Sequence, residues 1–385
     1  MMSQRLFFLF LIFAITLNCI AQKPIVGAER TWEYIPKLRN KKVGLVVNQT
    51  SVIGKTHLVD TLIKLNIAIQ SIFAPEHGFR GTADAGAHID NSVDTKTKLP
   101  IISLYGAKHA PSDADLKGMD VLVFDIQDVG CRFYTFISTL HYVMEACAKN
   151  HVELIVLDRP NPNGMYVDGP VLQKGFESFV GVDPIPVLYG MTIGEYGLMV
   201  KGEQWIANAD SLKMTVVKCS NYNHRTKYAL PVKPSPNLPN SQAITLYPSL
   251  CYFEGTNVSV GRGTNFPFQV VGSPYYDSLS ALYSFIPKPK DGAKEPFLLN
   301  KKCFGFDLRK NKTVGVNLFF VIKMYKGFRD KSKFFLANNF FDKLIGTDAV
   351  RKMIVDGKSE AEIRQTWQQD IEAFKIIRQK YLIYE

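Results

Sequence analysis

The chain has 385 residues, of which 46% are apolar and 21% charged, and its formal net charge is +11. This composition is typical of an ordered globular protein and excludes a disordered chain, while the length favours two domains. Such a charge favours an anionic partner: a polysaccharide, a cell wall or a membrane surface. Nucleic acid is not expected, because no helix-turn-helix signature or basic-aromatic platform accompanies the charge.

Residues 1–21 predict a secretory signal peptide. Arg5 supplies a positive start, a nearly unbroken apolar run follows, and Ala21 offers a small residue where a signal peptidase can cut. The segment is too short for a spanning helix with stop-transfer flanks, and no later segment predicts a membrane span. We therefore expect a periplasmic or secreted protein. A lipidated Cys19 is the alternative, although residues 16–18 match the usual small-residue pattern poorly.

Several kinds of site are disfavoured by missing motifs. The remaining cysteines are odd in number, widely spaced and without CxxC, which favours buried free thiols, with at most a pair or two oxidised, over a zinc ribbon or a disulfide scaffold. No GxGxxG or P-loop accompanies a strand–helix step, no HExxH is present, and GxSxG is absent. We therefore expect no cofactor and no metal. The cysteines in question are Cys131, Cys147, Cys219, Cys251 and Cys303.

Alternating apolar runs predict a doubly wound α/β domain over residues 22–232, with a mostly parallel sheet. Thr192 with Glu195 three residues later forms a capping box that marks one helix start. Parallel strands and covering helices are indicated by uncharged runs followed by segments of helical periodicity. Strands are expected at 42–48, 67–73, 99–105, 119–126, 152–157 and, at an edge, 212–219, with a short apolar run at 185–188 and helices at 57–65, 134–149 and 192–205.

The composition of the sequence changes after residue 230. Four prolines between 231 and 239 predict a semi-rigid connector. Residues 233–385 are therefore expected to form a smaller α+β C-terminal domain. Within it we expect a strand at 314–322 and helices at 334–344 and 360–384.

Carboxylates follow several predicted strands. Glu76 and His77 come directly after the apolar run that ends at 73, and Pro75 and Gly78 stop that strand. Asp125, Asp128 and Asp158 follow two later strands in the same way. Ligands of open α/β sheets bind outside the carboxyl ends of the strands, so these groups are candidates for one site. The alternative is that each of them caps or solvates its loop.

Converging carboxylates favour glycoside hydrolysis, which needs one protonated carboxyl group as acid and usually a second as base or nucleophile. A Glu76 half covered by Phe73 and Phe79 would tend to keep its proton. Arg132 and Arg262 are candidates for holding a substrate carboxylate with two hydrogen bonds. An ion pair between Arg132 and a neighbouring aspartate is the alternative. Tyr134, Tyr189 and Phe266 are candidates for stacking on a sugar.

Four blocks, at 73–81, 124–135, 157–164 and 253–264, together resemble the NamZ-type exo-β-N-acetylmuramidases. The resemblance implies a Rossmann-like domain without nucleotide, a smaller C-terminal domain and a site in the cleft between them. It also implies release of N-acetylmuramic acid from the non-reducing ends of peptidoglycan fragments, and it places the catalytic glutamate at Glu76. The second catalytic group stays open, because the substrate's acetamido group is a possible nucleophile.

We thus expect an exo-β-N-acetylmuramidase that acts on peptidoglycan-derived muropeptides or disaccharides. Glu76 would be the general acid/base, with His77 and Asp128 positioning it. Two alternatives are a non-catalytic muropeptide-binding protein and a peptidoglycan amidase or esterase. The residues expected to bind substrate are Asp125, Arg132, Tyr134, Asp158, Asn163, Tyr189, Glu254 and Arg262, the two arginines being assigned to the lactyl carboxylate.

Overall fold

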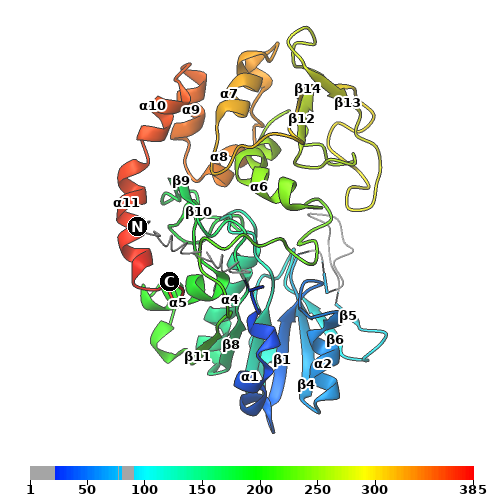
Figure 1. The fold of residues 1–385 in the computed structure, drawn as a ribbon, viewed down its shortest axis with the longest axis vertical. Helices are drawn as coiled ribbons and strands as arrows, with labels where there is room; N and C mark the ends of the chain where they lie inside the picture. The colour runs from blue at the N-terminus through cyan, green and yellow to red at the C-terminus, as the bar shows by residue number, and fades with distance from the viewer. Residues whose placement is uncertain (1–21, 77, 80–90) are drawn as a thin grey trace, which may run out of the picture.

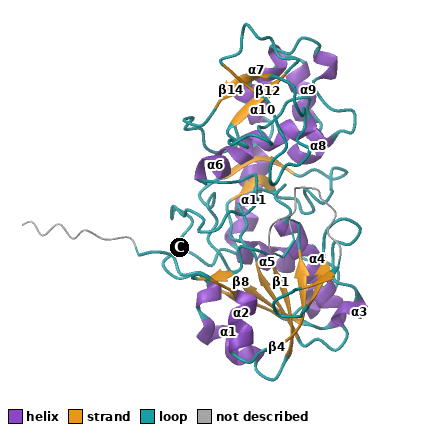
Figure 2. Ribbon diagram, turned by 90° about the vertical axis from the view of Figure 1, so that its right-hand side faces the viewer, coloured by secondary structure: helices purple, strands orange, loops and turns teal. Residues whose placement is uncertain are grey.

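The computed structural model describes residues 22–76, 78–79 and 91–385, and its N-terminal part is built on a seven-stranded sheet (Figures 1 and 2). The strand order is β11-β8-β7-β1-β4-β6-β5, and every neighbouring pair is parallel except β5 with β6. The strands are β1 (Lys42–Val47), β4 (Ala68–Ala74), β5 (Ser92–Val93), β6 (Pro100–Ser103), β7 (Val121–Asp125), β8 (Glu153–Leu157) and β11 (Met214–Val217). The predicted doubly wound α/β class is confirmed.

Helices cover both faces of this sheet because its strands are apolar on both sides. In β7, Val121 and Val123 face one core, whereas Leu122 and Phe124 face the other. Helices α1 (Thr31–Leu38) and α2 (Leu58–Lys64) cover the first face, and α3 (Asp113–Leu116), α4 (Phe136–Asn150) and α5 (Ile193–Gly202) cover the second. The predicted capping box is confirmed, since the Thr192 hydroxyl accepts a hydrogen bond from the backbone N–H of Glu195.

Smaller elements connect these layers. The 185–188 run forms β10 (Pro186–Tyr189), which pairs with β9 (Val167–Val171) in a separate antiparallel ribbon. β2 (Val52–Ile53) and β3 (Thr56–His57) form a hairpin between β1 and α2. Short 3-10 helices are η1 (Gly27–Glu29), η2 (Ala209–Ser211), η3 (Cys251–Gly255) and η4 (Lys331–Lys333).

The C-terminal part combines a small antiparallel sheet with helices. β14 (Cys303–Asp307) lies between β12 (Val270–Ser273) and β13 (Tyr283–Phe285). The helices are α6 (Ser241–Leu250), α7 (Phe319–Lys326), α8 (Phe340–Ile345), α9 (Ala349–Val355), α10 (Glu360–Gln365) and α11 (Gln368–Gln379).

Three element predictions in this part differ from the structure. The strand expected at 314–322 is wrong: Phe320, Val321 and Met324 are buried at helical spacing in α7, and the apolar run alone did not reveal the period. The 334–344 helix shortens to α8, which begins only after Asn339 adopts a left-handed backbone with φ of 56°. The 360–384 helix is divided into α10 and α11 at the buried Trp367.

The chain end returns to the N-terminal part, as α11 runs down beside it in Figure 1. The Tyr384 hydroxyl donates to Asp158 at 2.6 Å and accepts from the Cys219 N–H at 2.8 Å. Arg364 of α10 pairs with Asp168 of β9 at 2.8 Å. The two parts are therefore joined along the length of the molecule and not only through the connector.

Two further observations concern the described residues. Each of the five cysteines expected as buried thiols is a buried free cysteine. Every helix within residues 22–76, 78–79 and 91–385 is too short or too polar to cross a bilayer.

Arg132 is fully buried, and its guanidinium joins three backbone segments. Its Nη1 donates to the carbonyl oxygens of Pro170 and Ile185 at 2.8 and 2.7 Å, and its Nη2 donates to that of Leu344 at 3.1 Å. Burial lowers the pKa of Arg132 to about 9, so it keeps its charge at neutral pH. The expectation that Arg132 holds a substrate carboxylate is thus replaced by a structural role, because its donors face carbonyls of both parts of the chain.

Replacing this cation should be costly. Arg132→Met removes three hydrogen bonds to buried carbonyl oxygens, of which that of Ile185 keeps another donor, the N–H of Leu172, and we expect a loss of about 3 kcal/mol or more in the free energy of unfolding. Chemical denaturation measures this loss. The control is Arg309→Met, which removes a half-exposed pair with Asp307 and should cost under about 1 kcal/mol. Equal stability of the two variants would refute the role given to Arg132.

Candidate active site

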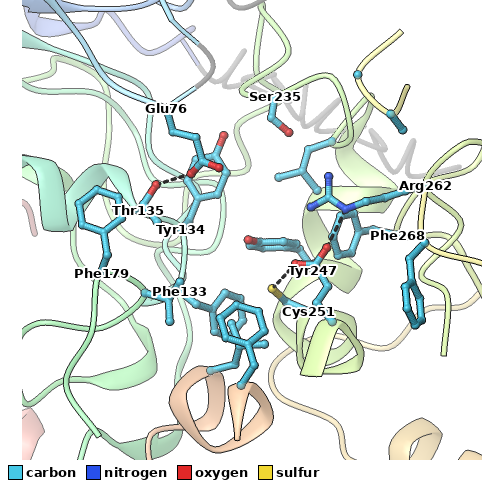
Figure 3. A pocket seen from close by; sticks show the side chains of 18 of the residues that line it. Glu76, Phe133, Tyr134, Thr135, Phe179, Ser235, Tyr247, Cys251, Arg262 and Phe268 are labelled. Carbon is cyan, nitrogen blue, oxygen red and sulfur yellow. Dashed lines mark hydrogen bonds and ion pairs between the residues drawn. The ribbon is translucent and has the colours of Figure 1, made fainter. Parts of the chain in front are cut away.

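A cavity of about 970 Å³ lies between the carboxyl edge of the large sheet and the C-terminal part (Figure 3). From the N-terminal side it is lined by loops that follow β4 and β6 and by the start of α4. From the C-terminal side it is lined by α6, η3 and two loops. The lining residues are Glu76, Tyr105, Gly106, His109, Phe133, Tyr134, Thr135, Phe179, Val180, Ser235, Leu238, Tyr247, Cys251, Glu254, Arg262, Phe268, Phe340, Leu344 and residues 292–297.

Glu76 is placed by a tight turn at the end of β4. The N–H of Gly78 donates to the carbonyl of Pro75 at 2.9 Å, and Gly78 has a φ of +76°, a conformation that favours glycine. The Thr135 hydroxyl donates to Glu76 Oε2 at 2.7 Å. Because Thr135 precedes the first turn of α4, the helix N-terminus also favours a negative charge at this point.

Tyr105 makes the second contact to Glu76. Its pKa is raised by burial first, and then by the charge of Glu76 and the hydrogen bond between the two side chains. The Tyr105 phenol therefore stays protonated, and its hydroxyl group donates a hydrogen bond to the Glu76 carboxylate. Two hydroxyl donors on separate elements fix Glu76 at the cavity.

The apolar cover expected for Glu76 is not what surrounds it. Phe73 and Phe79 are buried in the two cores on opposite faces of the sheet, and neither lines the cavity. Phe79 packs edge-on against His57, with 4.9 Å between ring centroids. The neighbours of the Glu76 carboxylate are the hydroxyl groups of Thr135 and Tyr105. Both residues are distant from Glu76 in sequence, so the sequence did not predict these contacts. His77 lies outside the described residues.

An ion pair occupies the facing wall. Arg262 Nε donates to Glu254 Oε1 at 2.6 Å, and the guanidinium lies 5.1 Å from the centroid of the Phe268 ring. Figure 3 shows the two terminal nitrogens of Arg262 directed toward the space in front of Glu76. Burial lowers the pKa of Arg262, but Glu254 more than offsets this effect and the net shift is upward. Arg262 is therefore a permanent cation at the cavity.

The aspartates expected beside Glu76 are buried elsewhere. Asp125 binds Arg159 through two contacts of 2.6 and 2.9 Å, and Asp158 accepts from Thr192 at 2.6 Å as well as from Tyr384. Burial raises the pKa of Asp158 to about 6 against the effect of these donors. Neither aspartate lines the cavity, since both tie loops at the sheet edge to one another.

Three other expected site residues share this structural role: Asp128, expected to position Glu76, and Asn163 and Tyr189, expected to bind substrate. Asp128 accepts hydrogen bonds from the Tyr189 hydroxyl and from the Gly130 N–H, and burial raises its pKa to about 6. Asn163 Nδ2 donates to the carbonyl of Val129 at 2.8 Å and borders a different cavity of about 470 Å³. Asp128 and Tyr189 lie behind the wall of the main cavity and do not line it.

Tyr134, Glu254, Arg262 and Glu76 are the expected residues that the cavity brings together. Phe266, which was expected to stack on a sugar, does not line the cavity, and its ring centroid lies 4.3 Å from the guanidinium carbon of Arg309. Phe268 lines the cavity wall instead. Thr135 and Tyr105 were missed as site residues, although Thr135 is the last residue of the 124–135 block and Tyr105 is the last residue of the strand expected at 99–105. His109, Phe179 and Tyr247 gave no signal, because their loops and helices reach the cavity only through the fold.

Within the described residues no group of three histidine, cysteine or carboxylate side chains is arranged to hold a metal ion.

Comparison with known proteins gives consistent matches. The N-terminal and C-terminal models of exo-β-N-acetylmuramidase NamZ match residues 43–242 and 245–384. The peptidoglycan β-N-acetylmuramidase NamZ of Bacillus subtilis (strain 168) is 38% identical over 381 residues, covering 91% of this chain and 89% of that protein.

Two crystal structures of DUF1343 family proteins from Bacteroides fragilis NCTC 9343 share the fold. One is 46% identical with a TM-score of 0.86, and the other is 28% identical with a TM-score of 0.79. Each comparison covers 94% of this chain and 99% of the other. The chain belongs to the NamZ exo-β-N-acetylmuramidase family.

Proposed function

We propose that this protein is an exo-acting glycosidase that releases N-acetylmuramic acid from the non-reducing ends of peptidoglycan fragments. The observation that carries the proposal is the Glu76 carboxylate, held at the cavity by Thr135 and Tyr105 and facing the Arg262 cation. Family membership supports the reaction class. The signal-like pattern of residues 1–21 supports export to the periplasm or beyond, where wall fragments are the substrates.

Glu76 is assigned the proton transfers. As general acid it gives its proton to the departing glycosidic oxygen, and as general base it then removes a proton from the attacking water. The hydroxyl groups of Thr135 and Tyr105 bind the carboxylate form and so fix its position between the two steps.

Arg262 is assigned to the lactyl carboxylate, the group that distinguishes muramic acid from glucosamine. Its Nε is bound by Glu254, which leaves the two terminal nitrogens for a two-pronged contact with a carboxylate. Glu254 therefore acts as a positioning residue that sets the plane of the guanidinium. The Phe268 ring on its other side limits rotation.

The second catalytic group is assigned to the substrate. Among the described lining residues, the carboxylates besides Glu76 are Glu254, which binds Arg262, and the exposed Glu295. The aspartates 125, 128 and 158 are buried in other contacts. The acetamido oxygen of the muramic acid itself is then the nucleophile that the proposal assigns.

Glu76→Gln should abolish catalysis with little change in the shape of the side chain, because an amide neither gives nor takes the proton. We expect release of muramic acid from a chromogenic glycoside to fall by about 10²- to 10⁴-fold. Glu295→Gln, which changes an exposed carboxylate on the same cavity, is the control and should keep wild-type activity. Retention of most activity by Glu76→Gln would remove Glu76 from the role. A parallel measurement of peptide release from a muropeptide would expose an amidase, and binding without turnover would indicate a non-catalytic protein.

Arg262→Met should weaken selection of muramic acid. The loss of a charged contact to the lactyl group predicts a kcat/KM lower by roughly 10- to 100-fold on the muramic acid glycoside. The glucosamine glycoside lacks that group, so its turnover should not change. Comparable losses on both substrates would show that Arg262 supports the cavity without reading the carboxylate.

Substitution on the substrate tests the nucleophile. An N-trifluoroacetyl glycoside has a less nucleophilic carbonyl oxygen, so we expect the enzyme to cleave it more slowly than the N-acetyl glycoside. As the control, the binding of both glycosides to Glu76→Gln is compared, to separate a loss of affinity from a loss of turnover. Equal turnover of the two would assign the attack to another group.

A further inference from the structure

One wall of the cavity is aromatic, and of its rings only Tyr105 has a role above, through its hydroxyl group. Tyr105, His109 and Phe179 line it, and Tyr142 packs behind them. The His109 and Phe179 rings stack with 4.1 Å between centroids and 21° between planes. Tyr142 and Phe179 are parallel within 11° at 6.3 Å, and Tyr105 lies 5.9 Å from Phe179. The rings of His109, Phe179 and Tyr142 are therefore nearly parallel, whereas the Tyr105 ring is tilted by 56° to Phe179, and the wall is built from three separate segments.

These rings are half-buried, and each keeps part of its surface open. The Nδ1 atom of His109 has no hydrogen-bond partner among the described residues. Burial lowers the pKa of His109, so the imidazole is neutral at physiological pH. His109 thus presents a flat, uncharged ring, and its visible contacts are stacking contacts.

Phe179 is held in place by its loop. The loop joins β9 to β10, and Arg132 binds a carbonyl near each end of it, at Pro170 and Ile185. At the tip, Ser178 and Gly181 exchange two backbone hydrogen bonds of 2.9 Å. A ring carried on a loop fixed at both its base and its tip presents a preformed surface.

The wall stands on the far side of Glu76 from Arg262. Tyr105 joins it to the acid, because its hydroxyl binds Glu76 while its ring lies beside Phe179. Figure 3 shows Phe179 on the Glu76 side of the cavity and Arg262 on the opposite side. A glycosidase acid lies beside the bond that it cleaves, with one sugar on each side of it. With the lactyl carboxylate at Arg262, the leaving sugar falls against the aromatic wall.

We infer that Tyr105, His109 and Phe179 form the binding platform for the leaving sugar, an N-acetylglucosamine unit in wall fragments. The inference rests on the proposed function and adds the recognition of the second sugar. A pyranose ring has a flat face of C–H groups, and covering that face with aromatic rings removes apolar surface from water. The platform gives affinity for the leaving unit and leaves the muramic acid contacts unchanged.

The test compares two substrates that differ only in the leaving group. One is the β-linked disaccharide of N-acetylmuramic acid and N-acetylglucosamine, and the other is the methyl β-glycoside of N-acetylmuramic acid, whose methyl group is too small to cover the platform. For His109→Ala and Phe179→Ala, kcat/KM on the disaccharide should fall by about tenfold, with less than about a twofold change on the methyl glycoside.

Matched variants separate stacking from other roles. His109→Phe keeps a flat ring and should retain wild-type preference for the disaccharide, whereas a proton-transfer role for His109 would make it fail on both substrates. Tyr275→Ala removes a partly exposed ring away from the cavity and should change neither value. Thermal melts of each variant establish that the comparison is made on folded protein.

The outcomes distinguish the two proposals. Equal losses of His109→Ala and Phe179→Ala on both substrates, or no loss on either, would overturn the platform. In that case, turnover of the methyl glycoside by the wild type would still support the proposed glycosidase. If the wild type releases muramic acid from neither substrate, the proposed function falls, and the platform falls with it.

Discussion

The buried guanidinium of Arg132 is the constraint on which the arrangement of the cavity depends. It lies where the β9–β10 ribbon, the loop between these strands and α8 meet, and it gives each of them a hydrogen bond. These hydrogen bonds require glycine at position 346, because a Cβ there would lie 2.5 Å from Arg132 Nη2. A single cation that is kept from water by three carbonyls thereby fixes one wall of the cavity to another.

Buried charge elsewhere serves the same end. Asp125 with Arg159, and Asp158 with Thr192 and Tyr384, join loops at the carboxyl edge of the sheet to segments distant in sequence. Leaving any of these carboxylates unpaired would cost far more than the pair gains, so the contacts specify one arrangement of the loops. Glu76 differs from these two strand-end carboxylates in its exposure: its surroundings open onto the cavity, whereas Asp125 and Asp158 are completely buried.

This difference explains how much of the site was predictable. The parallel strands were predicted well, because strands buried on both faces are uncharged runs of a length that few helices share. A strand end also identifies which side chains reach the active edge of the sheet, and Glu76 was found on that basis. The local sequence does not show how deeply a side chain at that edge is buried. Asp125 and Glu76 both come at the ends of apolar strands, yet Asp125 pairs with Arg159, which follows the neighbouring strand, and is completely buried.

The C-terminal part was predicted less well for a related reason. Its elements are short, and a run such as 314–322 is apolar enough for a strand, although only the burial of Phe320, Val321 and Met324 reveals the helical period. Arg262 and Glu254 were nevertheless named as substrate-binding residues, and both lie in the 253–264 block of the family resemblance, but their ion pair with each other was not predicted. The aromatic wall required the fold itself, since Tyr105, His109 and Phe179 come together only when the loop after β6 meets the β9–β10 loop.

The proposed acid and the proposed carboxylate-binding cation come from different parts of the chain, and this has a physical consequence. Glu76 belongs to the large sheet and Arg262 to the C-terminal part, so no local structure sets their separation. That separation is held by Arg132, by the Arg364 pair with Asp168 and by the Tyr384 hydroxyl, all at a distance from the reacting atoms. Because proton transfer and carboxylate binding each require hydrogen-bond geometry, a small shift between the two parts would weaken both together. The buried charges therefore maintain the geometry of the cavity, even though they do not contact it through their charged groups.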